Sequence, residues 1–163
     1  MTAIVSDAAA MIVLAKLGRL DLLRHIFSGV IIPQTIHGEI CAKSDHDTAV
    51  WQDAFFSILP DPADSLQKHL ETILDRGESA ALALAYSRGL PVLVDEKKGR
   101  TLARTIGIPV IGLAGVLLAL VRKGSIDEAA MASILDDARA IGFRLSDSLL
   151  QEVRQAGGGT LPR

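Results

Sequence analysis

Aromatic residues and cysteine are scarce in this chain. Phe, Trp and Tyr together make up 4% of its 163 residues, whereas hydrophobic residues of all kinds make up 49%. A buried core must therefore be built from Ala, Leu, Ile and Val, and the scattered aromatics give no obvious stacking platform for nucleic-acid bases. The single cysteine, Cys41, excludes an internal disulfide and fits a reducing cytoplasm.

An excess of charge of one sign is also lacking. The chain has 17 Lys and Arg against 19 Asp and Glu, which gives a formal net charge of -2. Overall charge therefore cannot attract nucleic acid, and only a local basic patch could do so.

Long apolar runs are absent as well. The longest uncharged stretch, residues 105–121, is interrupted by glycines and a proline, and it is shorter than the about 20 residues that a membrane-spanning helix needs. We interpret it as a buried strand followed by a core helix. No secretory signal is visible, because Met1 and Thr2 carry no basic charge and Asp7 interrupts the first apolar run. A cytoplasmic protein without a membrane segment is expected.

Short β-rich apolar runs alternate with longer helical stretches, which is typical of an α/β fold with a parallel sheet. The predicted strands are residues 3–6, 30–32, 56–59, 92–94 and 110–111. The predicted helices are residues 8–17, 20–27, a helix opened by Pro33, 48–54, 66–74, 78–87, 97–105 and 113–122. Gly77 is interpreted as a break before the helix at 78–87.

The C-terminal part of the chain is purely helical in pattern. Ser125 and Glu128 have the spacing of a capping box ahead of a helix at about 129–141. A second capped helix is expected from about residue 146. We assign residues 1–156 to one domain, because no linker is long enough to divide it, and we interpret 157–163 as a flexible tail.

Four carboxylates lie where predicted strands end or helices begin: Asp7, Glu39, Glu78 and Asp95. Each has a purely structural interpretation, since a strand-end Asp can cap the next helix and a first-turn Glu favours the helix dipole. All four nevertheless fall at the edge where open parallel α/β sheets bind ligands. The sequence therefore predicts a shared acidic site.

Neighbouring carboxylates repel one another, and a divalent cation is the simplest answer to that repulsion. All-oxygen ligands suit Mg²⁺ or Mn²⁺. Such a cation makes water a better nucleophile and stabilises charge on a phosphoryl oxygen, which favours phosphodiester hydrolysis. Glu96, next to Asp95, is a candidate fifth acid.

Basic residues follow the last of these acids. Lys97, Lys98, Arg100 and Arg104 could contact the phosphate backbone of a nucleic acid. The alternative is a solvated helix face, because Lys97, Arg100 and Arg104 follow helical spacing.

Other kinds of site fit the sequence less well. His37 and Cys41 are four residues apart, with Asp45 and His46 nearby, but no second ligand pair completes a zinc site. The turn after Ser6 lacks the glycines of a dinucleotide-binding loop, and neither a P-loop nor a nucleophile elbow is present.

Several segments resemble PIN domains, and most closely the prokaryotic PIN-like group related to VapC-type toxin ribonucleases. They are residues 5–7, the strand and proline leading to Glu39, and residues 77–85, 93–100, 108–112 and 142–146. The resemblance implies a parallel sheet in the order 3-2-1-4-5 with helices on both faces. It also implies Mg²⁺- or Mn²⁺-dependent ribonuclease activity, and often a homodimer and a small antitoxin partner.

Carried onto this sequence, the resemblance makes Asp7, Glu39, Glu78 and Asp95 the catalytic acids. The expected metal ligands are Asp7, Glu78, Asp95 and Glu96. One departure is Ala9, because the family usually has a hydroxyl or amide residue two positions after the first Asp. Loss of such an orienting partner can cost about 10–100-fold in metal affinity or activity. Ser6 or Ser79 are candidates to replace it, and a non-catalytic PIN-like binding or interaction protein is the rival interpretation.

An apolar stripe marks the predicted C-terminal helix: Met131, Ile134, Leu135 and Ala138. Most such stripes belong to the core. If this one is exposed, it would serve dimerisation or antitoxin capture.

Overall fold

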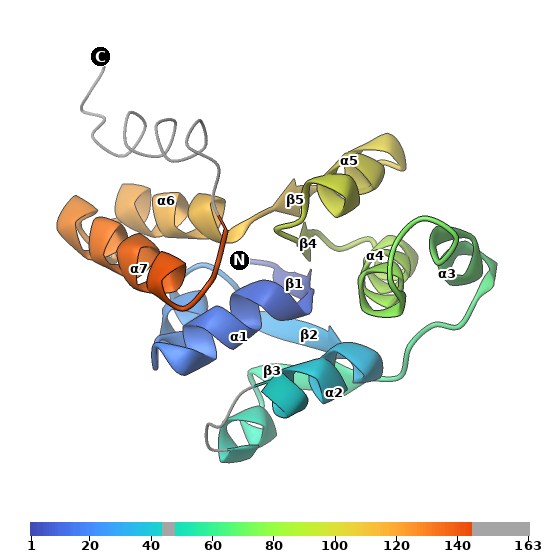
Figure 1. Cartoon of the computed structure of the whole chain (residues 1–163), viewed down its shortest axis with the longest axis horizontal. Coiled ribbons are helices and arrows are strands. Elements are labelled where there is room, and N and C mark those ends of the chain that lie inside the picture. Colours follow the sequence, from blue (N-terminus) through green and yellow to red (C-terminus); the bar gives the residue numbers. More distant parts are fainter. Residues whose placement is uncertain (44–47, 145–163) are drawn as a thin grey trace.

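Five parallel strands form one sheet in the order β3-β2-β1-β4-β5, as the resemblance implied (Figure 1). The structure is a computed structural model that describes residues 1–43 and 48–144. The strands are β1 (Ala3–Ser6), β2 (Gly29–Pro33), β3 (Phe56–Leu59), β4 (Val92–Leu93) and β5 (Val110–Ile111).

Helices connect these strands, and two of the short ones are 3-10 helices. They are α1 (Ala8–Lys16), the 3-10 helix η1 (Leu20–His25), α2 (Gln34–Lys43), the 3-10 helix η2 (Thr48–Gln52), α3 (Ser65–Leu70), α4 (Arg76–Arg88), α5 (Lys97–Thr105), α6 (Leu113–Lys123) and α7 (Glu128–Ala140). Their positions confirm the predicted α/β fold class. Pro33 ends β2 and does not lie inside the helix that follows.

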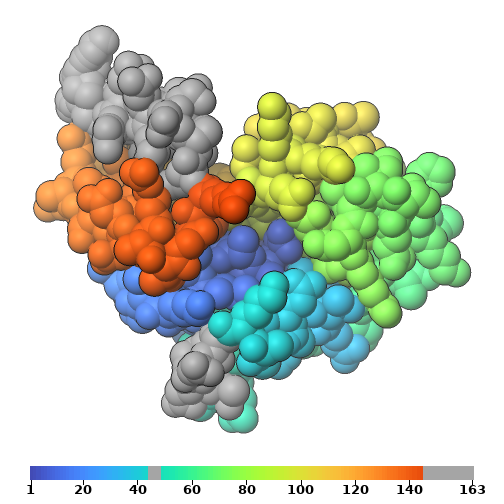
Figure 2. All heavy atoms as spheres, in the orientation of Figure 1, coloured from blue at the N-terminus to red at the C-terminus, as the bar shows by residue number. Residues whose placement is uncertain are grey.

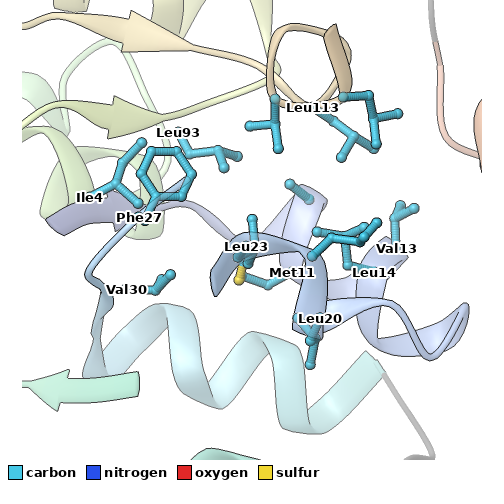
Figure 3. Packing of buried hydrophobic residues seen from close by; sticks show 14 of the residues in the cluster. Ile4, Met11, Val13, Leu14, Leu20, Leu23, Phe27, Val30, Leu93 and Leu113 are labelled. Carbon is cyan, nitrogen blue, oxygen red and sulfur yellow. The ribbon is translucent and has the colours of Figure 1, made fainter. Parts of the chain in front are cut away.

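Alternate residues of the strands face two separate cores. Ile4 and Leu93 belong to the larger cluster, which α1, η1, α2, α6 and α7 cover. Figure 3 shows Ile4 and Leu93 beside Phe27 in this cluster. Val5 and Val92 belong to the second cluster, which α3, α4 and α5 cover. The two-residue period of the strands thus places helices on both faces of the sheet.

Gly77 does not break the chain, contrary to the sequence-based expectation. Helix α4 begins at Arg76, and Gly77 lies in its first turn. The helix is started by Asp75, whose side chain accepts a hydrogen bond of 2.8 Å from the N–H of Glu78. A capping Asp offsets the low helix propensity of one glycine.

The expected capping box at Ser125 is also wrong. Asp127 is the capping residue of α7, and its Oδ1 accepts a hydrogen bond of 2.7 Å from the N–H of Ala130. Ser125 and Asp127 both have side chains that can cap a helix. Asp127 is the cap because α7 starts at Glu128. The helix expected from residue 146 and the tail at 157–163 lie outside the described residues.

The apolar stripe of α7 is buried. Met131, Ile134, Leu135 and Ala138 are each no more than 4% exposed and belong to the larger core. This stripe is therefore not a surface for a partner. No helix within residues 1–43 and 48–144 is long and apolar enough to span a membrane.

The capping assignment of α7 gives a stability prediction. Asp127→Ala removes the acceptor for the N–H of Ala130 and is expected to cost about 1 kcal/mol, or about 2–4 °C in Tm for a chain of this size. Ser125→Ala is the matched control and is expected to leave Tm unchanged. Thermal unfolding followed by circular dichroism measures both, and a larger loss for Ser125→Ala would contradict the assignment.

Candidate active site

Asp7 and Asp95 lie at the ends of two neighbouring strands. Strands β1 and β4 pair in parallel, with Ser6 opposite Leu93. The N–H of Asp7 extends this pairing by donating to the carbonyl of Leu93 over 3.0 Å. Strand order reverses between β1 and β4, which is where open α/β sheets form a ligand crevice. In the space-filling view, dark blue atoms near the start of the chain lie recessed among the cyan, green and yellow segments (Figure 2).

Asp7 is both a capping residue and a buried acid. Its Oδ1 accepts a hydrogen bond of 2.7 Å from the N–H of Ala8, at the start of α1. The residue is only 8% exposed. Asp7 can therefore cap α1 and also belong to an acidic site, because Oδ1 accepts the hydrogen bond from the helix while Oδ2 remains available.

Asp95 links three elements. Its Oδ1 accepts a hydrogen bond of 2.8 Å from the N–H of Leu113, at the start of α6. Its main-chain carbonyl accepts a hydrogen bond from Arg100 of α5. Its Oδ2 is buried and has no hydrogen-bond partner. Gly112 allows this packing, since a Cβ there would lie 2.9 Å from Oδ1 of Asp95.

Helices α2 and α4 bring Glu39 and Glu78 to the same edge. A Cβ on Gly77 would lie 2.5 Å from Oε1 of Glu39, so the absence of a side chain there lets α2 approach α4. A Cβ on Gly99 of α5 would lie 3.7 Å from Oε1 of Glu78 and 2.8 Å from Cγ1 of Val94. Glu78 is 5% exposed, whereas Glu39 is half-buried.

The charges of several of these acids act on one another's pKa values. Burial is the main cause that raises the pKa of Asp7 to about 7, and the charges of Asp75, Glu39 and Asp95 add to it. Burial likewise raises the pKa of Glu78 to about 8, helped by the charge of Asp7 and a hydrogen bond with Glu96.

The remaining two acids are also shifted upward. Burial raises the pKa of Asp95 to about 6, while the hydrogen bond from Leu113 and the charge of Arg100 oppose the rise. Burial and the charge of Asp75 raise the pKa of Glu39, and Lys43 opposes them.

Asp75 is a member of this acid cluster that sequence reasoning missed. It is exposed, yet its charge raises the pKa of Asp7, Glu39 and Glu78. The signal was present, because Asp75 precedes Glu78 by three residues, a capping spacing. The interpretation of Gly77 as a break hid it.

The predicted basic residues separate into three environments. Lys97 and Lys98 are exposed in the first turn of α5, beside Glu96. Arg100 is half-buried and points into the acid cluster, where it binds the carbonyl of Asp95. Arg104 is exposed in the last turn of α5, seven residues from Lys97 and therefore about 10 Å along the helix.

Neither Ser6 nor Ser79 replaces the polar group missing at Ala9. The hydroxyl of Ser6 donates over 2.8 Å to the main-chain carbonyl of Asp7, not to its carboxylate. The hydroxyl of Ser79 is buried and has no hydrogen-bond partner. The carboxylate of Asp7 is thus held by the N–H of Ala8.

The acids fit a divalent cation by chemistry. In the part of the chain that the structure describes, no three His, Cys, Asp or Glu side chains already stand together as a metal site. The donor set is nevertheless all oxygen, as Mg²⁺ and Mn²⁺ prefer. Oδ2 of Asp95 has no hydrogen-bond partner, so this oxygen is free to bind a cation.

The raised pKa values give a prediction for the chelator-treated protein. A folded-state pKa above the unfolded one means that the folded state binds more protons, so stability falls as pH rises towards 8. We expect Tm to drop between pH 5 and pH 8.5. Glu78→Gln should flatten this drop and at pH 8.5 be more stable than wild type by about 1 kcal/mol, or about 2–4 °C.

Glu128→Gln is the control for this prediction, because Glu128 is exposed in the first turn of α7, outside the acid cluster. It should keep the pH dependence of the wild type. A wild-type Tm that is constant from pH 5 to pH 8.5 would contradict the raised pKa values.

The contact of Gly77 with α2 gives a second prediction. Gly77→Ala would place a methyl 2.7 Å from Cδ1 of the fully buried Ile36 as well as against Glu39. We expect a loss of about 1–3 kcal/mol from overpacking, measured by urea unfolding. The control is Gly38→Ala on α2, where no atom lies within 4 Å, and where alanine should stabilise the helix by up to about 1 kcal/mol. Equal effects of the two substitutions would argue against the close contact.

Comparison with known proteins agrees with the fold. A family model described as a PIN domain matches residues 3–158. No curated protein matches the chain. PIN domains are generally nucleases that act on nucleic acid and typically use divalent metals. The match spans nearly the whole sequence, and the chain therefore belongs to the PIN-domain family.

Proposed function

We propose that this protein is a Mg²⁺- or Mn²⁺-dependent endoribonuclease that hydrolyses RNA phosphodiesters. The proposal is supported chiefly by Asp7 and Asp95, which follow the paired strands β1 and β4, and by Glu78 of α4, because burial raises the pKa of all three carboxyl groups. Buried acids that lack a counter-charge are typical of functional sites.

The cation would be held by Asp7, Glu78, Asp95 and Glu96. When bound, it would activate water and stabilise the negative charge that develops on a phosphoryl oxygen. Asp7 and Asp95 are suited to hold it because each uses Oδ1 to cap a helix. Those hydrogen bonds fix the orientation of both side chains on rigid elements.

Glu39 has a different place in the cluster. It is half-buried on α2, and burial together with the charge of Asp75 raises its pKa, which makes its carboxylate a stronger base. We assign Glu39 the role of general base, which accepts the proton released when water attacks the phosphorus atom. Asp75, which is exposed beside it, supports this role by its charge.

The toxin role, the homodimer and the small antitoxin partner stay predictions from the family resemblance. The stripe on α7 that could have served either partner is buried in the core. A homodimer would therefore need another surface.

A non-catalytic PIN-like module that binds nucleic acid or protein is the second candidate. Ala9 favours it. So do Ser6, whose hydroxyl donates to the main-chain carbonyl of Asp7, and Ser79, whose buried hydroxyl has no partner, because neither orients the carboxylate of Asp7. Metal binding alone does not separate the two candidates, so turnover must be measured.

The test is cleavage of a mixed pool of structured and single-stranded RNAs in Mg²⁺, in Mn²⁺ and with chelator. Wild type should cleave in at least one metal and not with chelator. Asp95→Asn keeps an oxygen that can cap α6 but removes the charge, and it should lower the rate by about 100-fold or more. Asp127→Asn, a capping Asp at the start of α7, is the matched control and should cleave as wild type does.

Absence of cleavage by wild type in both metals would favour the non-catalytic module. Ala9→Ser then tests whether a hydroxyl two residues after Asp7 restores activity. Cleavage that survives in Asp95→Asn would mean a contaminating nuclease or a misassigned site.

A further inference from the structure

A groove of about 520 Å³ lies beside the acid cluster. It is lined by Ile73, Glu96, Lys97, Lys98, Thr101 and Leu102. Its walls thus come from α5 and from the turn between α3 and α4. Figure 2 shows the green and yellow segments that contain these elements in contact. Its size falls in the range of pockets that hold small molecules.

The floor of the groove is apolar and uncovered. Ile73 is 48% exposed, one of four large hydrophobic residues with such exposure among the described residues. Leu102 is half-buried and packs against the second core cluster. An aliphatic surface of this kind favours contact with a flat apolar group.

The rim of the groove is positively charged. Lys97 and Lys98 are exposed and form no ion pair with any described residue. The hydroxyl of Thr101 is already engaged, because it donates over 3.0 Å to the carbonyl of Lys97. The rim can therefore attract an anion through its lysines, but it has few free hydrogen-bonding groups that could distinguish one base from another.

One end of the groove meets the acid cluster. Glu96 lines the groove and is near enough to Glu78 to help raise the pKa of Glu78. A ligand in the groove would thus lie next to the acids proposed to carry the chemistry.

From this arrangement we infer that the groove binds one unpaired nucleotide of the RNA strand, next to the phosphodiester presented to the acids. The base would rest on Ile73 and Leu102, and its phosphate would lie at Lys97 and Lys98. An apolar floor with a cationic rim is complementary to a nucleotide. The choice of RNA as ligand rests on the proposed function.

This assignment requires a single-stranded segment of RNA at the groove. In a duplex the bases are stacked and paired, so none can reach an aliphatic floor, whereas an unstacked base can. Contact with a base face is tolerant of sequence, and the lining residues offer few groups for hydrogen-bond readout.

The experiment measures binding of fluorescent eight-nucleotide oligouridine and of a matched RNA duplex to full-length Asp95→Asn protein in Mg²⁺. Asp95→Asn is used so that binding is observed without cleavage. The single strand should bind at least about tenfold more tightly than the duplex. Ile73→Gln should weaken single-strand binding about 5–10-fold without changing its salt dependence, because it removes only apolar contact.

The lysines should behave differently. Lys97→Gln combined with Lys98→Gln should weaken binding and also reduce the slope of log affinity against log salt by about 0.7 for each RNA phosphate that a lysine no longer neutralises. The control is Ile141→Gln, a 42% exposed isoleucine outside the groove, which should bind as the parent does.

Equal affinity for duplex and single strand would overturn the inference, as would unchanged binding by Ile73→Gln. A drop from dimer to monomer mass in Ile73→Gln, with RNA affinity retained, would assign the groove to a second copy of the chain. If wild type cleaves RNA but the groove variants bind normally, this inference fails alone. If no RNA is cleaved yet binding follows the expected pattern, the proposed enzyme fails and the groove assignment stands.

Discussion

The parallel pairing of β1 with β4 is the contact on which the rest of the site depends. Strand order reverses there, so α1 and α5 leave on opposite faces and the strand ends open into one crevice. Asp7 and Asp95 stand directly beyond that pairing. Their burial is a consequence of the topology, because helices on both faces cover the same edge from two sides. The raised pKa values are therefore a property of the fold rather than of any single neighbour.

Structural and chemical roles coincide in this acid cluster. Asp7, Asp75 and Asp95 each accept a hydrogen bond from the N–H of a residue at a helix start. Each therefore fixes the helix that covers the site, and each adds negative charge to it. A carboxylate has two oxygens, so capping does not use up its capacity to bind a cation. The question whether a strand-end Asp is a cap or a ligand has no single answer here.

The sequence predicted the α/β sheet and its strands, because the alternation of apolar residues along strands is a local signal. Prediction from sequence failed for residues whose role depends on contacts with other elements of the fold. Gly77 looks like a break in isolation, yet it is the position at which α4 touches Glu39 of α2. Asp75 was missed as a consequence, because the interpretation of Gly77 as a break hid the local capping spacing of Asp75 and Glu78. Arg100 looked like a free phosphate contact, whereas the fold turns it towards the carbonyl of Asp95. Such facts follow from packing, which one-dimensional spacing does not contain.

Charge is distributed unevenly around Glu96, although the whole chain has a formal net charge of only -2. On one side lie the acids, with Arg100 as their internal cation. On the other side lie Lys97 and Lys98 at the rim of the groove. Under the proposed function, an RNA phosphate would be attracted by Lys97 and Lys98 and repelled by the acids on the other side of Glu96. The cation would therefore have to be in place before the phosphate could advance, which makes metal binding a condition for productive substrate binding and not only for the chemical step.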